Sequence, residues 1–163
     1  MHSVGRNLNE TYEASPRSVA EGRAKLADFA ARVGATPSQV DAVRLAASEA
    51  MTNSVLHAYR GGPGLIYVNA AVASGELWIL ISDDGCGLRP RADRPGLGLG
   101  LGLISEVSDD FAIVSRATGG TEVRIRFNLV TADAPAEEPA RGQGVGHGRR
   151  TRFSRSMSVA SGP

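Results

Sequence analysis

The sequence predicts a two-layer α/β sandwich in which one mixed, mainly antiparallel β-sheet is covered on one face by three helices. Three observations lead to this fold class. Two alanine-rich stretches begin with Ser-Pro or Thr-Pro helix starts, two pairs of β-forming runs are joined by glycine-containing turns, and 42% of the 163 residues are hydrophobic. This length and composition suit one domain with a buried core and leave no room for a second full domain.

The first half of the chain is predicted to form a strand followed by two helices. Weak alternation over 8–15 indicates an edge strand, after which a Ser-Pro pair starts a helix over about 16–33 with apolar residues at helical spacing. A Thr-Pro pair starts a second helix, which continues to about His57 without an internal glycine or proline.

The second half is predicted to form two β-hairpins separated by a loop and a short helix. Each hairpin joins two runs rich in β-forming residues through a turn that contains glycine. The four predicted strands are 65–73, 76–84, 111–117 and 121–130. Between the hairpins, glycine, proline and charge over 85–97 predict a loop, and a helix follows over 98–108.

Charge and composition divide the chain into a domain over 1–130 and a tail over 131–163. All 17 acidic residues fall in 1–140 beside 13 basic ones, a balance of −4, whereas 141–163 holds five arginines and no acid, a balance of +5. The tail has no leucine or isoleucine, which predicts a disordered, arginine-rich segment. With a single aromatic residue it offers general phosphate attraction rather than a stacking surface, so direct nucleic-acid binding is not expected.

The composition also excludes several classes of mechanism. Lys25 is the only lysine and is not preceded by a glycine loop, so the phosphate-binding loop of P-loop NTPases is absent. The single cysteine, Cys86, cannot form an intramolecular disulfide, and three scattered histidines offer no Cys/His metal spacing. The N-terminus lacks the apolar stretch of a signal peptide and no run reaches the ~20 apolar residues of a membrane span, so a soluble, cytoplasmic protein without a membrane partner is expected.

The first candidate pair for chemistry is Glu49 and Asn53, which lie four residues apart on the second predicted helix and therefore project from one face. A carboxylate beside an amide oxygen suits a magnesium-phosphate site, because Mg²⁺ prefers oxygen ligands and a carboxylate can orient a hydroxyl or accept its proton. On an isolated amphipathic helix, the same pair is more commonly a solvated polar stripe.

Three glycine-containing motifs follow this pair. DDGCG at 83–87 ends a buried-looking strand, and it is either a common turn or an aspartate placed to accept a hydrogen bond from an amine such as that of adenine. GLGLGLG at 96–102 enters a helix whose exposed amides favour phosphate, although no register fits the dinucleotide pattern G-x-G-x-x-G. GGT at 119–121 closes the last hairpin and by itself is typical of a turn.

In the order ExxxN, DxGxG, GLGLG and GGT, the four motifs resemble the N, G1, G2 and G3 boxes of the GHKL (Bergerat) ATP-binding fold shared by gyrase, MutL and histidine kinases. The segments SEAMTNSVLHAY, ISDDGCGL and GLGLGLISEVSDDFAIVSRATGGTEVRIRF more narrowly resemble the anti-sigma factor serine/threonine kinases and their stand-alone actinobacterial relatives. The resemblance covers about residues 8–130 and leaves the tail aside.

The resemblance implies a role for each motif residue. Glu49 would be the general base, Asn53 the magnesium ligand and Asp83 the acceptor for the adenine amino group. Glycines would line the base pocket and cradle the phosphates, Thr121 would support the adenine end, and Arg94, in a loop that can also be merely solvated, can pair with the terminal phosphate. The full ATP-binding set is Asn53, Asp83, Gly85, Gly87, Arg94, Gly98, Leu99, Gly100 and Thr121.

The same resemblance implies an ATP- and Mg²⁺-dependent serine/threonine kinase that phosphorylates an anti-anti-sigma protein with a STAS domain, sequesters a sigma factor and forms a homodimer. The alternative is a regulatory module that binds nucleotide and a protein partner with little or no kinase activity, which the short loop between Gly87 and Gly98 favours. A histidine-kinase catalytic domain is less favoured, because the chain is too short to hold the phosphoacceptor helices as well.

Overall fold

The computed structural model describes residues 6–59, 62–87 and 99–129 of the chain. Their elements follow the predicted order of strand, two helices, hairpin, helix and hairpin. The elements are β1 (Asn7–Glu13), α1 (Pro16–Arg32), α2 (Pro37–Asn53), η1 (Ser54–Ala58), β2 (Leu65–Ala73), β3 (Glu76–Asp83), α3 (Leu99–Val107), β4 (Asp110–Ser115) and β5 (Thr121–Asn128). None of the described helices has the length and hydropathy needed to cross a membrane. The predicted tail over 131–163 lies outside the described residues.

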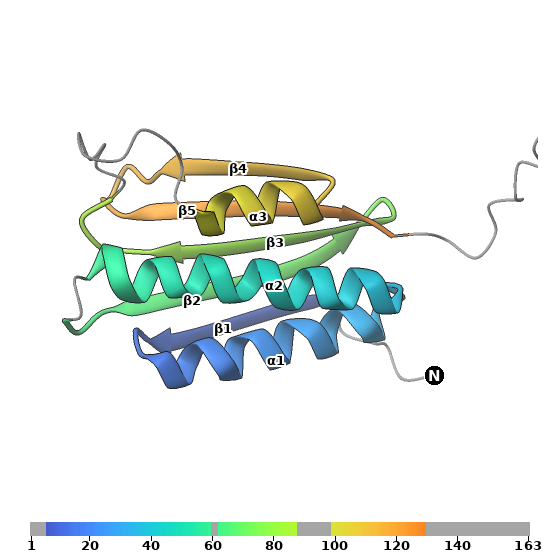
Figure 1. Ribbon diagram of the computed structural model, residues 1–163, viewed down its shortest axis with the longest axis horizontal. Coiled ribbons are helices and arrows are strands. Elements are labelled where there is room, and N and C mark those ends of the chain that lie inside the picture. Colours follow the sequence, from blue (N-terminus) through green and yellow to red (C-terminus); the bar gives the residue numbers. More distant parts are fainter. Residues whose placement is uncertain (1–5, 60–61, 88–98, 130–163) are drawn as a thin grey trace, which may run out of the picture.

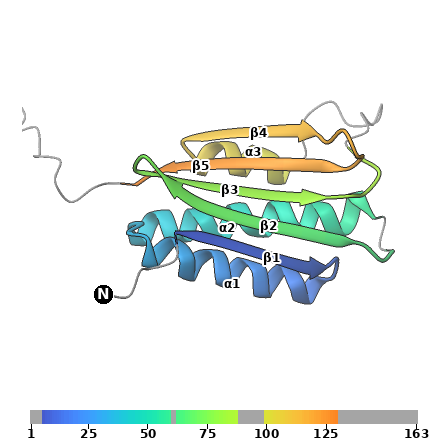
Figure 2. The same cartoon turned by 180° about the vertical axis from the view of Figure 1, so that it is seen from behind.

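The five strands form one sheet in the order β1-β2-β3-β5-β4, and every described pairing is antiparallel. Helices α1, α2 and α3 cover one face of this sheet (Figure 1), and the opposite face carries no helix from the described part of the chain (Figure 2). The predicted two-layer sandwich is therefore confirmed. The sheet is antiparallel throughout its described strands rather than mixed, because the second hairpin returns β5 beside β3 in the opposite direction.

Both long helices begin where the sequence places their caps. The Ser15 hydroxyl accepts a hydrogen bond from the Ser18 amide at 3.2 Å ahead of α1. Thr36 and Gln39 form a reciprocal capping box at the start of α2, with 3.2 Å from Gln39 N to Thr36 Oγ1 and 3.0 Å from Thr36 N to Gln39 Oε1. The proline in the first turn of each helix loses no hydrogen bond, since the first amides of a helix have no partner within it.

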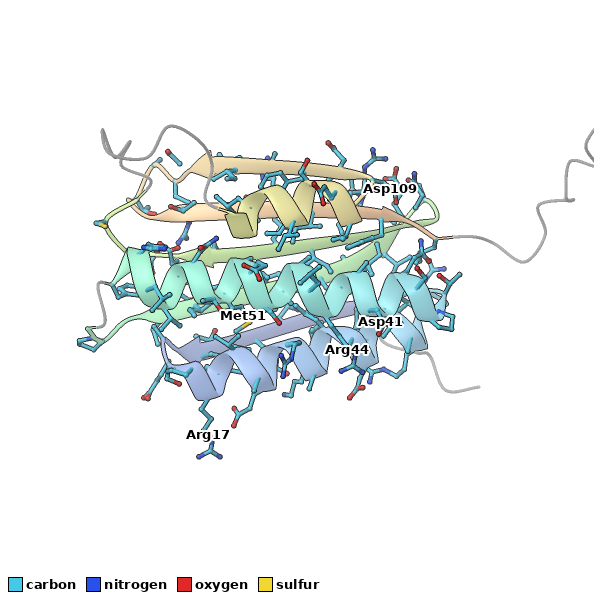
Figure 3. All side chains as sticks on the ribbon, in the orientation of Figure 1. Arg17, Asp41, Arg44, Met51 and Asp109 are labelled. Carbon is cyan, nitrogen blue, oxygen red and sulfur yellow. The ribbon has the colours of Figure 1, made fainter. Side chains whose placement is uncertain are left out.

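The core lies between the helices and the inner face of the sheet. Alternate residues of β2, β3 and β5 point inward and meet apolar positions of α1 and α2. The largest fully buried side chains are Phe29, Phe127, Leu26, Met51, Ile66, Leu77, Ile79, Ile81, Ile104, Ile125, Val43 and Val68. Met51 of α2 packs against Gly22 of α1 (Figure 3), where a Cβ would lie 2.6 Å from the Met51 sulfur. The absence of a side chain at Gly22 thus lets α1 and α2 pack closely against each other.

The outer face of the sheet, away from the helices, carries aromatic and charged side chains. Trp78, the only tryptophan, donates a hydrogen bond from Nε1 to Glu76 Oε2 at 3.0 Å, and the Arg126 guanidinium lies 5.8 Å from the centre of a Trp78 ring. Arg126 also forms an ion pair with Glu76. This cluster lies near the β2–β3 turn, at the opposite end of β3 from Asp83.

The main departure from the predicted elements is the end of the second helix. The α-helix ends at Asn53 and continues as the π-helical turn η1, where the sequence predicted unbroken α-helix to His57. Contacts from outside the helix hold this turn: the Ser54 hydroxyl lies 3.1 Å from Asp83 Oδ2, and the Ala58 carbonyl accepts a hydrogen bond from the Cys86 amide at 3.0 Å. Tertiary hydrogen bonds to the last residue of β3 and to the segment after it therefore accompany the change in helix type.

Candidate functional site

The motif residues gather at one end of the sandwich, at the left of Figure 1. The end of β3 lies beside the start of β5, because the antiparallel register pairs Ser82 with Glu122. The end of α2 reaches the same place through the hydrogen bond from Ser54 to Asp83, and the first turn of α3 contacts α2 there. Segments that are far apart in the sequence thus form one polar region where the helices meet the sheet.

Among the described residues, Asp83 is the one charged side chain that is buried, with 4% of its surface exposed. Its Oδ1 accepts hydrogen bonds from the backbone amides of Gly85 at 3.0 Å and Thr121 at 3.2 Å, and its Oδ2 accepts one from the Ser54 hydroxyl at 3.1 Å. An ionised carboxylate has about four acceptor positions, so these three donors set its orientation and leave capacity for one more. A buried acceptor held in this way suits an amine donor such as the exocyclic amine of adenine.

Two glycines let the backbone after β3 pass close to its neighbours. A Cβ on Gly85 would lie 2.5 Å from the Ala58 carbonyl oxygen of η1. A Cβ on Gly120 would overlap the Asp83 carbonyl oxygen, and Gly120 also has a left-handed φ of +83°. Glycine is therefore required at both positions if the turn after Asp83 is to lie between η1 and the β4–β5 turn.

Glu49 lies against the first turn of α3. A Cβ on Gly100 would overlap Glu49 Oε2, so the carboxylate sits directly over the α3 backbone at this position. The first amides of a helix have no partner within it and favour an anion such as a phosphate. Glu49 and the start of α3 thus face the same space, which places a proton acceptor next to a helix end suited to phosphate.

Asn53 follows Glu49 by about one helical turn, and its buried amide nitrogen has no hydrogen-bond partner among the residues that the structure describes. An unpaired buried polar group is costly, and a bound group that pairs with the amide would remove that cost. Because a side-chain amide can present either its oxygen or its nitrogen, the position fits Mg²⁺, which takes protein oxygens together with the phosphates of a substrate.

The structure places seven of the predicted residues at this end of the sandwich: Glu49, Asn53, Asp83, Gly85, Gly87, Gly100 and Thr121. Leu99 is the first residue of α3. Arg94 and Gly98 lie outside the described residues, so their phosphate contacts stay predictions. Ser54 was not predicted as a site residue, but its hydroxyl donates a hydrogen bond to Asp83. A small polar residue directly after Asn53 and before the apolar Val55 and Leu56 is the feature of the sequence that could have indicated it.

An antiparallel sheet with three helices on one face has the two-layer architecture of the GHKL class of domains, and the buried acceptor, the tight glycine turns and the start of α3 lie together at one end of it. A model of the histidine kinase-like ATPase domain matches residues 12–127. The chain therefore belongs to the histidine kinase-like ATPase domain family.

The relatives of this chain include several anti-sigma factors. The anti-sigma F factor of Halalkalibacterium halodurans is 25% identical over 141 residues, which cover 78% of this chain and 95% of that protein. The anti-sigma F factor of Clostridium botulinum strain Alaska E43 is 29% identical over 138 residues, which cover 76% of this chain and 96% of that protein. Among solved structures, the RsbU and RsbW domains of Rv1364c from Mycobacterium tuberculosis match with a TM-score of 0.60 and 26% identity, over 76% of this chain and 32% of that one.

Proposed function

We propose that this chain is an ATP-binding anti-sigma factor with serine/threonine kinase activity, which phosphorylates a STAS-domain anti-anti-sigma protein and holds a sigma factor inactive in the cytoplasm. The observation that carries the proposal is the arrangement of Asp83, Glu49 and the start of α3 at one end of the sandwich. An acceptor for the base, together with a proton acceptor beside a phosphate-binding helix end, suits phosphoryl transfer from ATP to a hydroxyl.

Asp83 would recognise the adenine end of the nucleotide. Because an ionised carboxylate only accepts hydrogen bonds, it favours a purine with an amine at this edge over one with a carbonyl. Thr121 supports this role by donating its amide to Asp83 Oδ1. Gly85 and Gly87 would leave the base room beside the backbone, and the left-handed φ of Gly87, +72°, is one that residues with a side chain rarely adopt.

Glu49 and Asn53 would act at the phosphate end. Glu49 would orient the acceptor hydroxyl and take up its proton as the phosphoryl group is transferred. Asn53 would hold magnesium through its amide oxygen, and the bound ion supplies neutralisation of the phosphate charge. The backbone amides of 98–100 would cradle the phosphates, and the Arg94 guanidinium would pair with the terminal one.

The partners are proposed from the relatives. Likeness to anti-sigma F factors over more than three quarters of this chain supports a sigma factor as one partner. The family resemblance adds a STAS-domain protein as the kinase substrate and a homodimer as the assembly. The alternative, a nucleotide-binding regulatory module with little or no kinase activity, differs from this proposal only in the transfer step.

Two variants separate nucleotide binding from transfer. Asp83→Asn keeps an oxygen for the amides of Gly85 and Thr121 but turns an NH₂ group toward the base. Calorimetric ATP binding should therefore weaken about 10- to 100-fold, the range for a lost hydrogen bond to a charged group. Glu49→Gln should keep ATP binding within about threefold and should lower transfer from labelled ATP to a STAS-domain protein by about 10²–10⁴-fold.

Each outcome decides one part of the proposal. Normal transfer by Glu49→Gln would contradict the role of Glu49 as general base, and undiminished ATP binding by Asp83→Asn would contradict the adenine contact. If the unchanged chain forms a complex with the STAS-domain protein and ATP but yields no phosphoprotein, the regulatory module is the correct function.

A further inference from the structure

A group of four side chains, Tyr59, Tyr67, Asp84 and Arg116, braces the turn after β3 and is named the Asp84 network. Asp84 is its centre and makes three contacts. Its backbone amide donates to Tyr59 Oη at 2.8 Å, its Oδ2 accepts from the Tyr67 hydroxyl at 2.7 Å, and its Oδ1 accepts from Arg116 Nη1. The network thereby ties strand β2 to the segments that follow η1, β3 and β4.

Arg116 connects the Asp84 network to Asp83. Its Nη1 also donates to the Asp83 carbonyl oxygen at 2.9 Å, and its guanidinium lies 5.7 Å from the centre of the Tyr67 ring, within range of a cation–π contact. The Asp83 carbonyl is the group that Gly120 approaches so closely that only glycine fits. The peptide after Asp83 is therefore held from two sides, by a cationic donor and by the backbone of the β4–β5 turn.

We propose that Arg116 is a positioning residue for base recognition, which sets the direction of the Asp83 carboxylate through the Asp83 main chain and Asp84 and thereby sharpens the preference for a 6-aminopurine nucleotide. The inference rests on the proposed function, because it takes Asp83 as the base acceptor. Recognition groups work fully only when held within about 0.5 Å and 10–20° of their best geometry by supporting contacts. Without Arg116 the Gly85 and Thr121 amides still bind Asp83 Oδ1, so the site loosens but persists.

Arg126 offers a matched control on the same sheet. It pairs with Glu76 and lies 5.8 Å from the centre of a Trp78 ring, so it has the same combination of carboxylate and aromatic partners as Arg116. The two arginine side chains are also similarly exposed, at 26% for Arg126 and 30% for Arg116. Arg126 lies across from Trp78, however, toward the end of the sheet that holds none of the motif residues.

The test compares the binding of ATP and of inosine triphosphate to the full chain by calorimetry. Inosine carries a carbonyl in place of the adenine amine, so the ratio of the two affinities isolates the contact with Asp83. Arg116→Gln should weaken ATP binding about three- to thirtyfold, which lies within the range for residues coupled in one hydrogen-bonded network, and should lower the ATP:ITP affinity ratio. Arg126→Gln should leave both affinities at their wild-type values.

Tyr67→Phe gives a second, milder variant, because it removes only the hydroxyl that donates to Asp84 and keeps the ring under Arg116. Tyr67→Phe should also lower the ATP:ITP affinity ratio. This variant can therefore decide the test if Arg116→Gln does not fold. A wild-type ATP:ITP affinity ratio in the folded variants would overturn the proposal even if their thermal stability falls. A general loosening of the site would weaken the binding of both nucleotides to the same extent and so leave the ratio unchanged. Failure of the unchanged chain to bind ATP would instead refute the proposed function.

Discussion

Gly120→Ala would place a methyl group where the chain has no room. Gly120 has a φ of +83°, and a Cβ there would lie 2.7 Å from the Asp83 carbonyl carbon and 2.9 Å from Asp84 Cα, both of them backbone atoms that cannot turn aside. The preceding residue, Gly119, has a similar φ of +92°, but no atom of the described residues lies within 4 Å of the position of its Cβ. Gly119→Ala therefore carries the conformational cost alone and is the matched control.

The expected losses of stability follow from these two geometries. A left-handed φ costs a residue with a Cβ about 1–2 kcal/mol, so Gly119→Ala should lower the free energy of unfolding by about that amount. Gly120→Ala adds a steric cost, since ordinary van der Waals contact begins near 3.4 Å. The Asp83 carbonyl carbon alone would have to move by 3.4 − 2.7 = 0.7 Å, and the Asp83 carbonyl oxygen, which the Cβ would overlap, would have to move farther. Such overpacking typically costs about 1–3 kcal/mol, which brings the total to about 2–5 kcal/mol.

Urea unfolding followed by circular dichroism measures these differences, and calorimetric titration with ATP gives a second readout. The displaced segment carries the 3.2 Å hydrogen bond from the Thr121 amide to Asp83 Oδ1, so Gly120→Ala should also weaken ATP binding by about tenfold or more. Gly119→Ala should bind ATP as the unchanged chain does. Equal unfolding free energies for the two variants, or wild-type ATP affinity in folded Gly120→Ala, would refute the reasoning.

Two further predictions concern α3 and alkaline pH. Gly102→Ala should raise the unfolding free energy by about 0.5–1 kcal/mol, since its Cβ would meet no atom in the described part of the chain. Gly100→Ala should displace the Glu49 carboxylate and lower phosphoryl transfer, and equal transfer by both variants would contradict this contact. Hydrogen bonds to carboxylates raise the pKa of the Tyr67 phenol and the Lys25 ammonium above their usual 10.0 and 10.5. The folded chain holds both protons more tightly than the unfolded chain does. The contribution of these two hydrogen bonds to the free energy of unfolding is therefore fully present below the usual pKa values, and it is lost as the pH rises through the raised ones. The free energy of unfolding in urea should fall less steeply with rising alkaline pH for Tyr67→Phe than for the unchanged chain. An equally steep fall would contradict the raised pKa of Tyr67.

The sequence predicted those elements whose ends are decided by local chemistry. The strand over 65–73 has the predicted limits, because glycine-containing turns bound a run of β-forming residues on both sides. The starts of α1 and α2 follow from Ser15 and Thr36, whose hydroxyls cap amides three residues ahead. The motifs could be grouped into one site through their resemblance to the GHKL boxes, and the structure brings two of them together by pairing the end of β3 with the start of β5.

Features decided by contacts between distant segments were not predicted. The π-helical turn after Asn53 has no local breaker in the sequence, and the hydrogen bond that Ser54 makes across it joins residues 29 positions apart. Arg116 follows a strand and has the local pattern of a solvated residue. Its hydrogen bonds to Asp83 and Asp84 join residues 33 and 32 positions apart, and no nearby residue marks them.

Trp78 gives the chain a built-in optical reporter. It is the only tryptophan, it lies on the outer face of the sheet, and it is five residues from Asp83 along β3, or about 17 Å at the usual rise of a strand. Indole emission responds to the polarity around the ring, so a protein that covers this face of the sheet would shift the fluorescence, whereas a nucleotide at the other end of β3 would leave it nearly unchanged. Unlabelled protein can thus distinguish the docking of a partner on the sheet from the entry of a ligand beneath the helices.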